Sequence, residues 1–262
     1  MNRRQFLTTT VTTTVTAAAV APLIAADAAP KDTRCYELRV YYSPEGKLDA
    51  LNARFRNHTT KLFEKHGMTN VGYWMPLENP ERKLFYILSY PDRKARDASW
   101  KAFIADPDWK RAASESEKDG GLVAKVESTF LTTTDYSPEV KPAKHDPAKT
   151  FELRIYTCSP GKLPNLHARF RDHTMKLFSK YGMKHFGYWT LDKGQPGAED
   201  TLLYFISHDS DKARQTSFDA FRADPDWKTV REASEKAAGG SLTVKDGVLS
   251  VSMLATDYSP AS

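Results

Sequence analysis

Apolar residues in the first half of the chain follow strand and helix periodicities in turn. The segment 35–42, CYELRVYY, alternates and is rich in β-formers, which predicts a strand. Over 47–66 the apolar residues recur at helical spacing, which predicts a helix ending at Gly67. The segments 70–77 and 83–90 predict two further strands joined by a polar turn. The pattern therefore begins as strand, helix, strand, strand.

A second helical segment and a last strand complete the unit. The helical pattern after residue 90 is interrupted at Asp106-Pro107, where proline favours the end of one helix and the start of another. The apolar and β-branched stretch over 122–134 predicts the closing strand. The order β-α-β-β-α-β is typical of the ferredoxin-like split fold, so an α+β class is expected.

The same unit occurs twice. Of the 39 positions in 36–74, 23 are identical to the corresponding positions of 151–189. DPDWK and TDYSP also recur, and a proline- and lysine-rich linker over 138–149 separates the copies. We expect repeats at 35–137 and 150–260, too long for solenoid units. Their sheets can bury one another's free faces, which predicts two ferredoxin-like (βαββαβ) repeats forming an intrachain α/β barrel.

The N-terminus differs from the rest of the chain. Arg3-Arg4 precede Phe6-Leu7, and a stretch of modest apolarity ends in small residues near Ala26. These features predict a signal peptide over 1–28 of the twin-arginine type. The mature protein is then expected to be periplasmic or secreted, without a transmembrane segment.

The composition and the motifs that are missing from the sequence disfavour several classes of function. The formal net charge is +5, or about +4 without the signal, and the mature chain intersperses basic with acidic residues, which disfavours nucleic-acid binding. No metal site is predicted, because Cys35 and Cys158 are the only cysteines and no zinc-like spacing occurs. Whether these two cysteines pair stays open. No nucleophile elbow, GxGxxG or Walker loop is present, and no cofactor is predicted.

The chain resembles the NIPSNAP family through several motifs that occur in the same order in both halves. They include YELRVY, the RFRNHT cluster at 54–59, GYW, DPDW and TDYS, and they return as FELRIY through the final TDYS. The resemblance covers nearly the whole mature chain. It implies the dimeric α/β-barrel fold and no established reaction or catalytic residue. Haem ligation by His58 or His173 would rest on fold analogy alone.

The helix over 47–66 supplies candidate binding residues. On a wheel of 100° per residue, Phe55 lies in the apolar stripe, His58 at its edge and Arg54 on a cationic border. Arg169 and His173 repeat this arrangement in the second copy. One interpretation is an anion-binding rim, in which arginine holds a carboxylate and histidine donates a hydrogen bond or acts as a base. The other is a solvated helix face with a histidine satisfied at the core edge.

Aromatic pairs on a strand of each copy are further candidates. Adjacent residues on a strand face opposite sides, so one of each pair faces the helices and the other faces away. These residues are either core or ligand platform. The pairs are Tyr73-Trp74 and Tyr188-Trp189. Glu37 and Arg39 share one face of the first strand, and they form either a cross-strand ion pair or part of the lining of the barrel interior.

Two functions stay open, and the sequence does not decide whether the protein is an enzyme. The first is binding, or cofactor-independent transformation, of a small anionic or aromatic molecule in pockets between helix and sheet. The second is a non-enzymatic protein–protein interaction module. A homo-oligomer or a protein partner is compatible with either.

Overall fold

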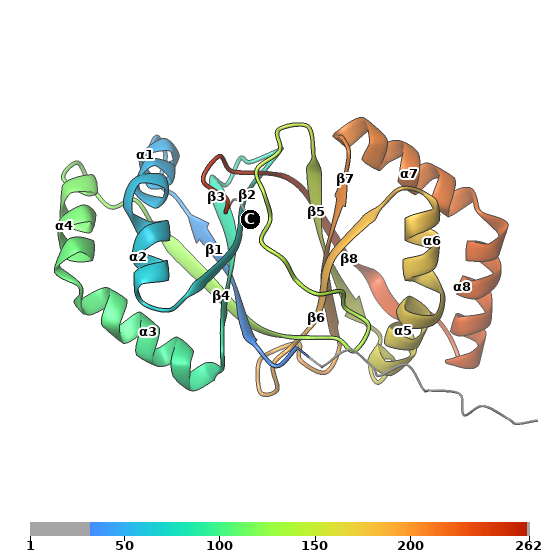
Figure 1. The fold of residues 1–262 in the computed structure, drawn as a ribbon. Helices are drawn as coiled ribbons and strands as arrows, with labels where there is room; N and C mark the ends of the chain where they lie inside the picture. Colours follow the sequence, from blue (N-terminus) through green and yellow to red (C-terminus); the bar gives the residue numbers. More distant parts are fainter. Residues whose placement is uncertain (1–31, 261–262) are drawn as a thin grey trace, which may run out of the picture. The chain divides into compact units, whose positions relative to one another are not determined.

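The computed structural model describes residues 32–260, so the signal peptide predicted over 1–28 lies outside the described residues. Eight antiparallel strands close into a barrel, and two groups of helices cover opposite sides of it (Figure 1). The first repeat contains β1 (Cys35–Tyr42), α1 (Leu48–Arg54), a π-helical turn η1 (Phe55–Thr59), α2 (Thr60–Lys65), β2 (Thr69–Pro76), β3 (Lys83–Tyr90), α3 (Arg93–Ala105), α4 (Pro107–Ser116) and β4 (Lys125–Thr133).

The second repeat has the same elements in the same order. They are β5 (Thr150–Cys158), α5 (Leu163–Arg169), a π-helical turn η2 (Phe170–Thr174), α6 (Met175–Lys180), β6 (Lys184–Leu191), β7 (Thr201–His208), α7 (Asp211–Ala223), α8 (Pro225–Ala237) and β8 (Thr243–Ala255). The predicted break at Asp106-Pro107 is confirmed: the Asp106 carboxylate caps α4 by accepting the Asp108 N–H at 2.7 Å.

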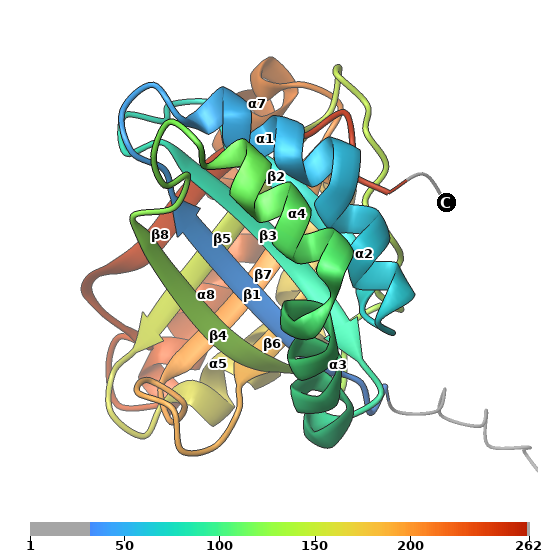
Figure 2. The ribbon, with the colours of Figure 1, turned by 90° about the vertical axis from the view of Figure 1, so that its left-hand side faces the viewer.

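The barrel confirms the predicted fold class. Its strand order is β1-β3-β2-β8-β5-β7-β6-β4, so each repeat contributes four neighbouring strands. The repeats meet at two seams, β2 with β8 and β4 with β6, each with a register of three residue pairs. Figure 2 shows α1 to α4 lying over the outer face of the first repeat's strands.

Trp74 and Trp189 fill the barrel interior, and both are completely buried. Each ring lies over a glycine two residues earlier, Gly72 or Gly187, where the strand register also shifts. A Cβ at either glycine would overlap the tryptophan ring, so these positions require glycine. The interior is therefore a packed apolar core.

Each TDYSP segment packs against the helix of the other repeat. We call residues 134–138 and 256–260 the exchanged tails. Asp257 accepts two hydrogen bonds from Arg56, at 2.6 and 2.7 Å, and Asp135 accepts two from Arg171, at 2.7 and 2.8 Å. The second arginine of each RFRxHT cluster thus links the two halves.

The linker between the repeats also packs on the barrel. Val140 and Ala143 are buried, and the Ala143 N–H donates to the Val71 carbonyl at 2.7 Å. Ser259, in an exchanged tail, donates to the Ala143 carbonyl at 2.6 Å. No helix within the described residues is long and apolar enough to cross a membrane.

Candidate functional site

Two equivalent cavities lie between the helices and the outer face of the barrel, one in each repeat. The second-repeat pocket has a volume of about 260 Å³ and the first-repeat pocket about 240 Å³. Equivalent positions line both, since Arg54 and Arg169, Phe55 and Phe170, and Trp109 and Trp227 correspond in the duplication. The duplication therefore preserved a cavity as well as a fold.

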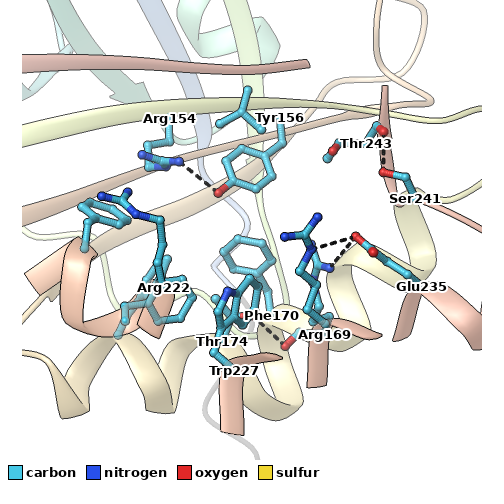
Figure 3. Close-up of a pocket in the computed structure, with 15 residues that line it drawn as sticks. Arg154, Tyr156, Arg169, Phe170, Thr174, Arg222, Trp227, Glu235, Ser241 and Thr243 are labelled. Atoms are coloured by element: carbon cyan, nitrogen blue, oxygen red, sulfur yellow. Dashed lines mark hydrogen bonds and ion pairs between the residues drawn. The ribbon is translucent and has the colours of Figure 1, made fainter. Parts of the chain in front are cut away.

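Arg169 extends into the second-repeat pocket (Figure 3). Its side chain is 6% exposed, and its Nε and Nη1 have no hydrogen-bond partner. Glu235 is the nearest carboxylate, with Oε1 at 3.8 Å from Nη1, and the guanidinium lies 5.2 Å from the Trp227 ring centroid. Burial lowers the pKa of Arg169, although it stays charged at neutral pH. A buried cation with free donors is costly until an anion or water binds it.

The equivalent arginine of the first repeat is better satisfied. Arg54 Nη1 donates to Glu117 at 2.6 Å and to the Ser116 hydroxyl at 3.4 Å. Its guanidinium also lies 5.2 Å from an indole ring, that of Trp109. In the first-repeat pocket the Glu117 carboxylate therefore pairs closely with the buried arginine. In the second-repeat pocket the equivalent carboxylate, Glu235, lies farther from Arg169.

The rims of the two pockets differ in charge. Ile104 and Ala113 line the first-repeat pocket where Arg222 and Arg231 line the second. Both rim arginines are largely exposed, and each pairs with one carboxylate of its own helix, Arg222 with Asp219 at 2.6 Å and Arg231 with Glu235 at 3.3 Å. The second-repeat pocket consequently has a cationic entrance above an aromatic interior, while the first-repeat pocket is mainly apolar.

A buried ion pair lies beside the second-repeat pocket, and its arginine, Arg154, lines the pocket. Arg154 donates to Glu152 at 2.6 Å and to the Tyr156 hydroxyl at 3.2 Å. Burial acts to raise the pKa of Glu152, but contacts with His208 and Arg154 outweigh it and lower this pKa to about 2. The carboxylate therefore stays ionised and holds Arg154 in place, so Arg154 is less available than Arg169 to a ligand.

In the first repeat the corresponding pair is Glu37 and Arg39, 2.5 Å apart between Oε1 and Nη1. Arg96 and Trp100, on α3, also donate to Glu37. The pair therefore faces the helices, and it is an ion pair along one strand rather than lining of the barrel interior.

The positions expected for His58 and His173 on the helix are wrong. Both side chains are exposed rather than at the core edge. The wheel assumed 3.6 residues per turn throughout, whereas residues 55–59 and 170–174 form π-helical turns that shift the following residues around the axis. Thr59 takes the buried position, and its hydroxyl donates to the Arg54 carbonyl at 3.2 Å. Thr174 bonds the Arg169 carbonyl in the same way, at 3.1 Å.

The expected place of the first arginine is also wrong. Arg54 and Arg169 are buried rather than on a charged border. The wheel considered only the face toward the sheet, but the last helix of each repeat covers a second face through Trp109 or Trp227. Because the first helix packs against the sheet on one side and against the last helix on another, arginines that lie outside the apolar stripe are also buried.

The aromatic pairs lie in the core on both sides of the sheet. Tyr73 and Tyr188 face the helices, whereas Trp74 and Trp189 face the barrel interior. None of the four lines either pocket. Sequence reasoning instead missed Arg222 and Arg231. Comparing the repeats could have identified them, because each is an arginine where the first repeat has an uncharged residue, Ile104 or Ala113.

The two cysteines are free and buried. Burial raises the pKa of both thiols to about 11, so neither is a ready nucleophile at neutral pH. Within residues 32–260, no group of three or more histidine, cysteine or acidic side chains could hold a metal ion.

The NIPSNAP family profile matches residues 36–138 and 151–240, that is, both repeats. This chain belongs to the NIPSNAP family. No curated protein matches the sequence.

Solved structures with a similar fold cover most of this NIPSNAP chain. A candidate monooxygenase from Lactobacillus acidophilus NCFM is 14% identical with a TM-score of 0.54, over 86% of this chain and 94% of that one. Another from Fusobacterium nucleatum is 9% identical with a TM-score of 0.57, over 85% and 92%. An anthrone oxidase-like protein is 10% identical with a TM-score of 0.54, over 86% and 92%. At these identities the likeness concerns the fold alone.

Proposed function

We propose that this NIPSNAP protein binds a small aromatic anion, such as a monocyclic carboxylate, in the second-repeat pocket. The observation that carries the proposal is the buried guanidinium of Arg169, whose Nε and Nη1 lack hydrogen-bond partners. A carboxylate that accepts bonds from this guanidinium would satisfy free donors in a water-poor site, where charge-assisted hydrogen bonds are strong.

The size and walls of the pocket support an aromatic ligand. Its volume of about 260 Å³ lies just below the usual range for small-molecule sites, which suits a single ring with an acidic group. Tyr156, Phe170 and Trp227 supply aromatic walls. Rim arginines Arg222 and Arg231 would attract an anion from solution. The names of the structural neighbours favour aromatic substrates and oxidation as the first reactions to assay, but the proposal itself concerns binding.

Calorimetric titration with benzoate and with neutral benzyl alcohol tests this proposal. Benzoate is expected to bind at least tenfold more tightly, because only the carboxylate can form charge-assisted hydrogen bonds with Arg169. Arg169→Gln should weaken benzoate binding about tenfold or more. The matched variant Arg54→Gln should change it less than twofold, since Arg54 lies in the other pocket and is paired with Glu117.

Two further variants guard against misfolding. Arg222→Gln, at an exposed rim position, should weaken binding a few fold without affecting folding. His173→Ala should leave it unchanged, since that side chain is exposed and does not line the pocket. Equal affinity for benzoate and benzyl alcohol, or a larger effect from Arg54→Gln than from Arg169→Gln, would overturn the proposal.

The proposal includes export to a bacterial periplasm or beyond. The support is the sequence of residues 1–28, with its paired arginines and small residues near Ala26. Fusing residues 1–31 to a fluorescent reporter should send the reporter to the periplasm of a bacterial host, and replacing Arg3 and Arg4 by lysine should keep it in the cytoplasm. A reporter that stays in the cytoplasm with both arginines present would refute export.

A further inference from the structure

The two seams of the barrel are closed differently. At the seam of β4 with β6, the Gln195 carboxamide bonds both backbone groups of Phe130. Its Oε1 accepts the Phe130 N–H at 2.9 Å, and its Nε2 donates to the Phe130 carbonyl at 2.7 Å. The Asp192 N–H donates to the same carbonyl at 2.9 Å. Gln195 therefore extends the sheet by the equivalent of one peptide unit.

Ser252 occupies the equivalent place at the other seam. It stands opposite Glu152 on β5, just as Phe130 stands opposite the equivalent Glu37 on β1. Its carbonyl accepts the Leu77 N–H at 2.9 Å, which repeats the bond made by Asp192. Because the N–H and C=O of one strand residue point to the same side, the Ser252 N–H also faces this seam.

No carboxamide completes this second seam within residues 32–260. The turn between β2 and β3 is three residues shorter than its counterpart over 192–200. Its one carboxamide, on Asn79, instead bonds both backbone groups of Lys83, at 2.7 and 2.9 Å. The Ser252 N–H and the second acceptor position of its carbonyl have no side-chain partner there.

A groove of about 650 Å³ lies beside these groups. The turn over 76–81 and residues 249–252 of β8 line it, together with Asp211, Arg214 and Gln215 on α7. The Gln215 carboxamide donates to Asp211 at 2.8 Å. A serine at 252 in place of phenylalanine also leaves side-chain space. Leu77 and Leu249 are 43% and 55% exposed at its margins. The groove thus combines an unfilled amide position with two exposed leucines and several charged side chains.

We propose that this groove binds the carboxamide of a glutamine or asparagine in a peptide segment of a partner protein. The carboxamide accepts the Ser252 N–H and donates to the Ser252 carbonyl, as Gln195 does at Phe130. Neighbouring apolar side chains of the peptide pack on Leu77 and Leu249. The site is separate from the second-repeat pocket, and neither proposal depends on the other.

The chain supplies its own probe for this site. An acetylated, amidated peptide with the sequence of residues 190–200, TLDKGQPGAED, carries the glutamine in its natural setting. In NMR titrations of the isotopically labelled protein, it should shift the Ser252 amide resonance and those of the facing turn. Replacing its glutamine by leucine should weaken binding about tenfold, the effect expected from losing two hydrogen bonds.

A loop graft provides the second arm of the test. Residues 77–82 are replaced by the sequence of 192–200, so that the new glutamine fills the groove from within. The graft should abolish binding of the peptide while the barrel remains folded, as judged by thermal unfolding. Equal binding of the glutamine and leucine peptides, or shifts confined to other surfaces, would overturn the proposal. So would concentration-dependent Ser252 shifts without peptide, which would identify a second copy of the chain as the occupant.

Discussion

Glu37→Gln should destabilise the protein by about 3 kcal/mol at pH 7. The Glu37 side chain is completely buried and accepts hydrogen bonds from Arg39 at 2.5 Å, from Arg96 at 2.8 and 2.9 Å, and from Ser128 at 2.7 Å. Removing its charge leaves two arginines beside a neutral amide, and breaking a buried ion pair costs about 3–5 kcal/mol. The amide introduced by the substitution can still accept some of these hydrogen bonds, so the expected cost lies near the lower end of this range of about 3–5 kcal/mol.

The lowered pKa of Glu37 expresses the same interactions. Burial acts to raise this pKa, but the Arg96 hydrogen bonds and the Arg39 charge outweigh it and lower the value from 4.5 to about 2. Such a shift corresponds to about 3 kcal/mol of preference for the ionised carboxylate in the folded state. The stabilisation is complete above the unfolded pKa of 4.5 and is lost as the pH falls toward 2.

Urea unfolding of both proteins between pH 7 and pH 2.5 measures this effect. The difference in unfolding free energy should be near 3 kcal/mol at pH 7 and should shrink below pH 4.5, because only the wild type loses this contribution. Glu127→Gln is the control: Glu127 pairs with Lys125 at the surface, and its loss should cost at most about 0.5 kcal/mol. A cost below about 1 kcal/mol for Glu37→Gln, or one that does not change with pH, would refute the reasoning.

Three further predictions follow from the packing. Gly187→Ala should lower stability by about 1–3 kcal/mol in chemical unfolding, because the new methyl group overlaps the Trp189 ring. Thr174→Val should cost about 1–2 kcal/mol by the same measurement, because it removes the hydrogen bond from the buried Thr174 hydroxyl to the Arg169 carbonyl at the π-helical turn. Cys35 and Cys158 should react with a thiol reagent only after denaturation, since burial raises the pKa of both thiols to about 11.

Matched controls isolate each effect. Gly121→Ala should be nearly neutral, because a Cβ there meets no atom within 4 Å. Thr216→Val removes a hydroxyl bond on the exposed face of α7 and should cost at most about 0.5 kcal/mol. Rapid labelling of either cysteine in the folded protein would contradict the placement of the thiols, as would a Gly187→Ala variant as stable as the wild type.

Repetition and hydrophobic periodicity were sufficient to predict the fold. The alternation in 35–42, the interruption at Asp106-Pro107 and the recurrence of each motif determine strand, helix and domain order with little dependence on distant contacts. The barrel followed because two ferredoxin-like sheets of one chain must each cover an apolar face.

The candidate site was harder to predict because it depends on contacts between distant segments. The sequence singled out Arg54 and Arg169, but their burial arises from α4 and α8 packing over the first helices. The π-helical turns moved both histidines into solvent, and a wheel with a constant period cannot represent such a turn. The difference between the two pockets was visible only by comparing each rim position with its counterpart.

The covalent linkage of the two repeats has a consequence for how such a barrel can specialise. In a symmetric assembly of two identical chains, every substitution occurs in both cavities and at both seams. Here Arg222 stands where the first repeat has Ile104. Gln195 bonds both backbone groups of Phe130 at one seam, whereas no carboxamide in residues 32–260 bonds the equivalent Ser252 at the other. A single gene product therefore presents two unlike cavities and two unlike seams, so that one half can acquire a new ligand while the other preserves the shared scaffold.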